Sequence, residues 1–78
     1  MATVKQAIHE HDVVALTHAV DKVEGTGQWP VGTTGTVVDE RGTDKLIEIY
    51  NDLGETLDFI SQPEDQLKLI AAKYPQSA

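Results

Sequence analysis

Three short segments rich in β-branched and aliphatic residues follow one another between residues 33 and 61, with only tight turns between them. They read TTGTVVDE, KLIEIYN and TLDFIS, and the connections are RGTD and NDLGE. Apolar and polar residues alternate along the second and third segments, which is the period of a strand with one face on a core. Because connections this short join antiparallel neighbours, the sequence predicts a three-stranded meander.

The same alternation predicts which side chains face the core. Ile47 and Ile49 fall on one face of the middle segment. Leu57 and Phe59 are expected to point inward from the last segment, with Thr56 and Asp58 outward. A glycine inside the first segment, Gly35, indicates a bend or the close approach of another backbone.

The chain upstream of the meander predicts a short helix, a strand and a long loop. Thr3 and Gln6 have the spacing of a capping box. The apolar residues that follow have helical spacing: Val4, Ala7 and Ile8. Residues 12–17, DVVALT, are predicted as a strand, and residues 18–32 as a long connection punctuated by glycine and proline.

The C-terminal segment has two interpretations. Ser61 and Glu64 form a second capping-box pattern, and apolar residues follow at helical spacing, which predicts a helix. Four curled strands, however, leave open edges that a further strand can pair with. We therefore favour one helical turn over residues 63–66, followed by a fifth strand over residues 67–71.

These elements predict a mainly β protein, an SH3-like barrel of five strands with a short N-terminal helix and one helical turn before the last strand. Residues 1–78 form a single domain, with the barrel at about residues 12–71 and a tail at residues 72–78. Bent strands that close on themselves let few residues enclose a core. The chain has no cysteine, so no disulfide or thiolate metal site supports that core.

The charge balance restricts the classes of partner. Six basic residues stand against 13 acidic ones, giving a formal net charge of −7. Phosphate backbones are poor partners for such a chain, so we expect no nucleic-acid binding. No apolar run approaches the roughly 20 residues of a membrane span, and the first residues lack the apolar centre of a signal peptide. We expect a soluble cytoplasmic protein with no membrane contact.

Four stretches occur in a fixed order between Glu10 and Ile70: EHDVVALTHAV, WPVGTTGTVVDE, IEIYNDLGETLDFI and EDQLKLI. In these stretches the chain resembles a family of small bacterial proteins, a domain of unknown function, that share a DVV-L opening, a P-G-GTVV turn and a closing QL segment. The resemblance implies an SH3-like barrel without established catalytic residues, and an accessory or neutralising role. The chain departs from the pattern at Thr34, where valine is common, and in a longer first loop around EGTGQW.

The residues do not predict an enzyme. GTTGT lacks the Lys-Ser/Thr ending of a phosphate-binding loop, and no long helix follows it. Neither Ser61 nor Ser77 has a sequence context that marks an activated nucleophile. The paired carboxylates are sequence neighbours, which point apart on a strand. We expect no catalytic residues and no cofactor.

The histidines give a second hypothesis. His9, His11 and His18, together with Asp12, are residue types that bind metals. Solvated histidines explain the same pattern, so no metal site is assigned. A small-ligand or metal-binding accessory protein that uses these histidines is the alternative to an interaction module.

The aromatic residues and the acidic loop predict a protein-binding surface. Tryptophan and tyrosine are the residues that most often anchor interfaces. The surface we predict comprises Trp29, Pro30, Tyr50, Asp21, Glu24 and Asp52. Trp29 has a second interpretation, as a cap that fills one open end of the barrel.

We therefore expect a non-catalytic interaction module that acts as an accessory or neutralising partner of a basic protein. The acidic residues of the predicted surface favour such a partner. Pairing between exposed strand edges of two copies, giving a homo-oligomer, is left open.

Overall fold

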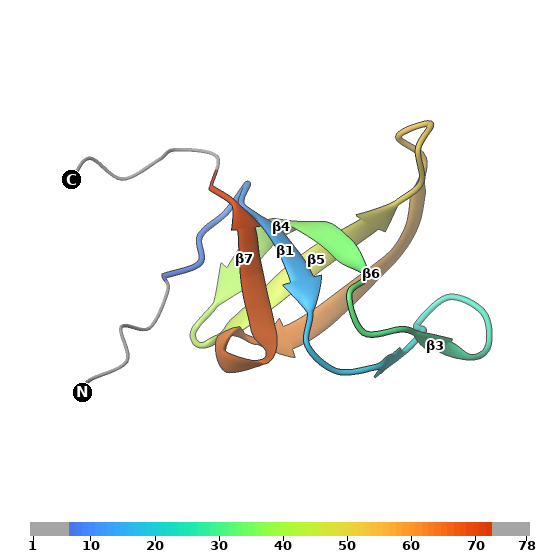
Figure 1. The fold of residues 1–78 in the computed structure, drawn as a ribbon, viewed down its shortest axis with the longest axis horizontal. Helices are drawn as coiled ribbons and strands as arrows, with labels where there is room; N and C mark the ends of the chain where they lie inside the picture. The colour runs from blue at the N-terminus through green and yellow to red at the C-terminus, as the bar shows by residue number, and fades with distance from the viewer. Residues whose placement is uncertain (1–6, 73–78) are drawn as a thin grey trace.

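A five-stranded antiparallel sheet and a two-stranded ribbon make up the fold in the computed structural model, which describes residues 7–72 (Figure 1). The elements are β1 (Val13–Leu16), β2 (Val20–Asp21), β3 (Gln28–Trp29), β4 (Thr34–Arg41), β5 (Asp44–Tyr50), β6 (Thr56–Pro63), the 3₁₀ helix η1 (Glu64–Gln66) and β7 (Leu67–Ala71). The prediction of a mainly β protein is confirmed.

The strand order of the large sheet is β6-β5-β4-β1-β7. β4, β5 and β6 form the predicted meander, and β7 returns to pair with β1 (Figure 1). The C-terminal segment is therefore a strand preceded by one 3₁₀ turn, and the alternative long helix is wrong over the described residues. Pairing with β1 covers an open edge of the sheet and satisfies the backbone of Leu67–Ala71, whereas a short helix is marginal by itself.

The predicted closed barrel is wrong. Within residues 7–72 no ladder joins β6 to β7, the two ends of the strand order. The outer edge of β6 faces the β2–β3 ribbon instead. There, the backbone N–H groups of Val23 and Glu24 donate to the Asp58 carboxylate at 2.8 and 3.1 Å. The ribbon occupies the place at which a fully closed sheet would continue.

The predicted N-terminal helix is also wrong where the structure describes it. Residues 3–6 lie outside the described residues, and residues 7–12 contain a turn and no helix. Ile8 is buried in the core, and its N–H donates to the Glu64 carboxylate at 2.7 Å. The N–H of His9 donates to Asp12 at 2.9 Å. Side chains elsewhere in the fold thus satisfy donors that a helix would have used.

The core is a single aliphatic cluster between the faces of the curled sheet. Its buried members are Ile8, Val14, Leu16, Val37, Ile47, Ile49, Ile60 and Leu67. Val20, Trp29 and Leu69 pack against it from its margin. With eight buried aliphatic side chains, the domain depends on close packing at each of them.

The predicted orientation of the β6 side chains is wrong, because the face expected to point inward points to solvent. Leu57 and Phe59 are 43% and 47% exposed, whereas Asp58 and Ile60 are each 1% exposed. The register explains the difference, because Ile60 pairs with Ile47 on the core face. Successive side chains alternate, so this pairing turns Asp58 inward and its neighbours outward.

At Gly35, β4 lies too close to β5 to accommodate a side chain. A Cβ atom at this position would lie 2.6 Å from the Glu48 carbonyl oxygen and 2.6 Å from Cγ2 of Ile47. Contacts this short do not occur between real atoms, so only glycine fits without a shift of the backbone. The predicted close approach at Gly35 is confirmed.

We predict that Gly35→Ala destabilises the domain by about 2 kcal/mol, the typical cost of overpacking a dense core. The measurement is the free energy of unfolding in urea. Thr34→Ala, at the exposed neighbouring position of the same strand, is the control and should change stability by less than about 0.5 kcal/mol. Equal stabilities for Gly35→Ala and the wild type would contradict the close approach.

Candidate functional site

The buried carboxylate of Asp58 connects the two sheets. It accepts hydrogen bonds from the N–H groups of Val23, Glu24 and Phe59 at 2.8, 3.1 and 2.9 Å. It also accepts one from the indole Nε1 of Trp29 at 2.9 Å. Three of these four donors belong to the β2–β3 ribbon, so Asp58 fixes the ribbon against β6.

The ionised form of Asp58 is the one that this arrangement requires. Burial by itself raises the pKa of the Asp58 carboxyl, because it penalises the charged form. The hydrogen bonds from Trp29, Val23, Phe59 and Glu24 act in the opposite direction and outweigh it. The pKa of Asp58 therefore lies below its ordinary value of 3.8.

Trp29 has a structural role in this arrangement. Its ring packs against the core cluster, its indole N–H donates to Asp58, and the Lys22 ammonium lies 4.5 Å from the ring centroid. Trp29 therefore packs at the margin of the core and helps to hold the ribbon, although the described residues form no closed barrel for it to cap. A binding role for its remaining exposed surface stays a prediction.

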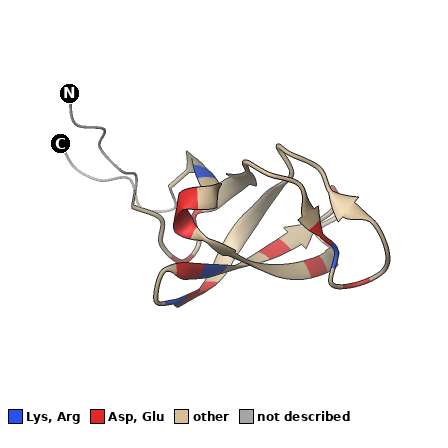
Figure 2. Cartoon of the chain, turned by 90° about the horizontal axis from the view of Figure 1, so that it is seen from below, with Lys and Arg blue, Asp and Glu red and all other residues tan. Residues whose placement is uncertain are grey.

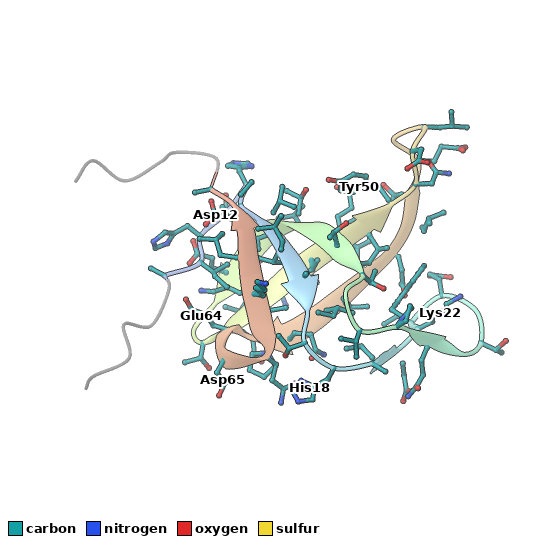
Figure 3. The ribbon with its side chains drawn as sticks, viewed as in Figure 1. Asp12, His18, Lys22, Tyr50, Glu64 and Asp65 are labelled. Atoms are coloured by element: carbon teal, nitrogen blue, oxygen red, sulfur yellow. The ribbon has the colours of Figure 1, made fainter. Side chains whose placement is uncertain are left out.

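The other predicted surface residues fall into two groups. Asp21, Glu24 and Pro30 are exposed on or beside the β2–β3 ribbon, where Asp21 accepts a hydrogen bond from Gln28 at 2.9 Å. Tyr50 ends β5, and Asp52 lies in the β5–β6 turn. Figure 3 shows Tyr50 well separated from Lys22 of the ribbon, so the predicted residues do not form one continuous patch.

Three apolar side chains on the solvent face of β5 and β6 form what we call the outer apolar face: Tyr50, Leu57 and Phe59. Their exposed fractions are 41%, 43% and 47%. Leu53, at the tip of the connecting turn, is 83% exposed and extends the same hairpin. Several large apolar side chains gathered on one exposed hairpin are typical of an interaction site.

Sequence reasoning missed Leu57 and Phe59 as surface residues. The sequence carries one signal that could have found them. Ile60 and Phe59 are adjacent and both apolar, so a strand must expose one of them. Asp58 shares the face of Ile60, and a carboxylate inside a core needs donors such as the lone indole of Trp29.

The carboxylates that border the outer apolar face form no ion pair among the described residues. Glu48 pairs with Phe59 across the β5–β6 ladder, and its carboxylate accepts a hydrogen bond from the Thr56 hydroxyl. Asp52 and Glu55 lie in the turn at the end of the hairpin. In residues 7–72 the ion pairs involve other acids: Glu10, Asp39 and Glu40. Figure 2 shows acidic segments spread over the whole molecule.

A groove of about 540 Å³ lies between the ribbon and the outer edge of β6. Its walls are Ala19, Val20, Asp21, Val23 and Gln28 on the ribbon side, and Ile60, Ser61 and Gln62 on β6. Apolar and polar side chains both line it. It begins beside Asp58, where hydrogen bonds hold the ribbon to the sheet.

The histidines are not brought together. His9 lies 3.7 Å from the Glu40 carboxylate, and His11 lies 3.7 Å from that of Glu10. The ring of His18 instead contacts the Thr17 hydroxyl, and Figure 3 places it at the opposite end of β1 from Asp12. Among residues 7–72, no three histidine or carboxylate side chains form a group that could hold a metal ion.

Comparison with known proteins adds no assignment. No family model, no curated protein and no solved structure matches the chain. The resemblance to a family of small bacterial proteins therefore stays a prediction. Within the described part of the chain, no helix has the length and apolar character needed to cross a membrane.

We predict that Asp58→Ala destabilises the domain by about 3 kcal/mol, because the substitution leaves buried donors without an acceptor. Urea unfolding measures the effect. Asp52→Ala removes an exposed carboxylate and should change the free energy of unfolding by less than about 0.5 kcal/mol. Trp29→Phe keeps a ring but deletes one donor, and should cost less than Asp58→Ala. If Asp58→Ala unfolds at the wild-type midpoint, Asp58 does not connect the two sheets.

Asp58 also makes stability depend on pH. Its pKa is lower in the folded chain than its ordinary value, so its contribution is complete well above pH 3.8 and is lost as pH falls through the folded pKa. We therefore expect the stability difference between the wild type and Asp58→Asn to shrink as pH is lowered from 6 to about 2.5. Chemical unfolding at each pH measures that difference. A difference that stays constant or grows on acidification would show that the ionised form is not the stabilising one.

Proposed function

We propose that this protein is a non-catalytic interaction module that binds a basic protein. The observation that carries the proposal is the outer apolar face beside carboxylates that form no ion pair among the described residues. Apolar side chains give contact area, and the carboxylates attract and orient a cationic surface. We also propose an accessory or neutralising role toward this basic partner in the cytoplasm, the role and the compartment expected from the sequence.

The strand order supports an SH3-like topology for the module. A first strand, a long loop, a three-stranded meander, one 3₁₀ turn and a last strand beside the first occur in this sequence. In this arrangement the connections and hairpins project from a small sheet that is held by its core. Functional residues commonly lie on such projecting segments, because the scaffold positions them.

The binding residues that we assign differ in part from those expected from the sequence. Tyr50 and Asp52 remain, and Leu57 and Phe59 join them on the same hairpin. Trp29 is assigned to the structure of the ribbon, and its neighbours Pro30, Asp21 and Glu24 belong to a second, adjoining region. The hairpin assignment is the one that mutation can test without disturbing the core.

We predict that the double substitution Leu57→Ser and Phe59→Ser lowers affinity for the partner at least about tenfold, since exposed anchors of this size are common hot spots. The assay is capture from a lysate by the immobilised domain, with quantitative mass spectrometry at increasing salt. Captured proteins that depend on the two residues should be basic and released by salt. Ile70→Ser, at a 51% exposed position of β7, is the matched control and should retain them.

Two results would contradict the proposal. One is capture that the double substitution leaves unchanged. The other is capture only of acidic proteins, or of proteins that high salt fails to release. Circular dichroism and urea unfolding of each variant show that a loss of capture reflects the surface and not the fold.

A further inference from the structure

We infer that the groove between the β2–β3 ribbon and β6 binds an extended, lysine- or arginine-containing segment of the partner, which adds to β6 as a further strand. This inference rests on the proposed function, because it names the part of the basic partner that is recognised. Strand addition to an exposed sheet edge is a general mode of peptide recognition.

The backbone of β6 offers an edge to such a strand. β6 is the terminal strand of the sheet, so β5 pairs with only one of its sides. The N–H of Phe59 donates to the Asp58 carboxylate and therefore points away from β5. Because hydrogen-bonding directions alternate along a strand, the N–H and C=O of Ser61 share that outward direction.

The hydrogen bond made by the Ser61 carbonyl agrees with this direction. Its oxygen accepts from the side-chain amide of Gln62 at 2.6 Å, in place of a neighbouring strand. A flexible, exposed amide is readily exchanged for the N–H of an incoming backbone. The edge at Ser61 is thus oriented for pairing and is covered by one side chain.

The ribbon keeps the groove open. Asp58 ties Val23 and Glu24 to the sheet at one end, whereas Val20 and Asp21 stand across the groove from Ile60–Gln62. β2 pairs with β3 on one side only. An extended segment in the groove therefore has the outer edge of β6 on one side and the ribbon wall on the other, where the side chains of Val20 and Val23 provide apolar contacts.

The acidic residues near the groove favour a cationic segment as its occupant. Asp21 lines the groove, and the exposed Glu24 follows Val23 of the groove wall in sequence. Neither acid takes part in an ion pair among the described residues. A second copy of this chain would bring another net charge of −7 to the same place, which opposes pairing of like molecules. The described ends of the chain, residues 7 and 72, lie on the far side of the molecule from the ribbon in Figure 1. A cationic segment of another protein fits these constraints best.

We test the inference with a blocked synthetic octapeptide that alternates lysine with valine and threonine. Titration of the intact, isotope-labelled protein is followed by amide chemical shifts and hydrogen exchange. We expect shifts at Val20, Asp21, Ser61 and Gln62, with slower exchange of the Ser61 amide. N-methylation of alternate peptide residues on the side facing β6 should weaken binding about tenfold, because main-chain hydrogen bonds supply affinity in this mode. The same peptide with glutamate in place of lysine should not bind.

Two substitutions at Ser61 test whether the outward N–H of this residue takes part in binding. Ser61→Pro removes the outward N–H and should weaken binding about tenfold, whereas Ser61→Ala keeps this N–H and should bind like the wild type. Proline is tolerated on edge strands at positions whose N–H faces solvent. If Ser61→Pro does not fold by circular dichroism, the N-methylated peptides decide the question alone.

Three outcomes overturn strand addition. In the first, the lysine peptide shifts only Tyr50, Leu57 and Phe59 and N-methylation has no effect, which leaves the proposed function standing. In the second, the groove amides shift with protein concentration alone and light scattering shows a dimer. In the third, the lysine peptide does not bind while lysate capture still depends on Leu57 and Phe59. The proposed function is tested separately, because its failure would appear in the lysate-capture experiment and not in the peptide titration.

Discussion

The carboxylate of Asp58 is the interaction on which the arrangement of this small domain depends. A ribbon with two residues in each strand is too short to be stable alone. Three hydrogen bonds from the ribbon to one buried anion give this ribbon a fixed place beside β6. The groove exists for the same reason, since the ribbon is held at one end and diverges from β6 beyond it.

The strands were largely predictable from the sequence because alternation and turn residues are local signals. The meander, the single 3₁₀ turn and the last strand follow from them. The face of β6 that points to the core was not predictable in this way. Two apolar residues, Leu57 and Phe59, alternate on one face, and this pattern favours that face over the one that carries Ile60. Tertiary interactions decide that face: Ile60 pairs opposite Ile47, and Asp58 finds its donors in a distant loop. The absence of a helix at residues 7–12 also reflects distant contacts, here between Ile8 and Glu64.

The sequence predicted the residue types of the candidate site, acidic and aromatic, but only some of their positions. Excess acid and exposed aromatic residues are visible in the composition, and Tyr50 and Asp52 lie where such a surface forms. Trp29 illustrates the limit of residue-type statistics. A single tryptophan in a small chain is both the best interface anchor and the best filler of a core margin, and its indole N–H needs an acceptor in either role. That acceptor, Asp58, lies 29 residues away in sequence.

Charge connects the fold to the proposed binding. The described cations are largely engaged within the molecule: Lys22 lies over Trp29, Arg41 pairs with Asp39 at 3.1 Å, and Lys45 pairs with Glu40 at 3.0 Å. The carboxylates at the hairpin and the groove form no ion pair among the described residues, and a net charge of −7 opposes compaction through self-repulsion. Under the proposed function, a cationic partner would relieve this repulsion as it binds, and association would also stabilise the fold. The exposed apolar side chains of β5 and β6 would add contact area that salt does not screen, and with it a specificity that charge alone would not provide to the proposed complex.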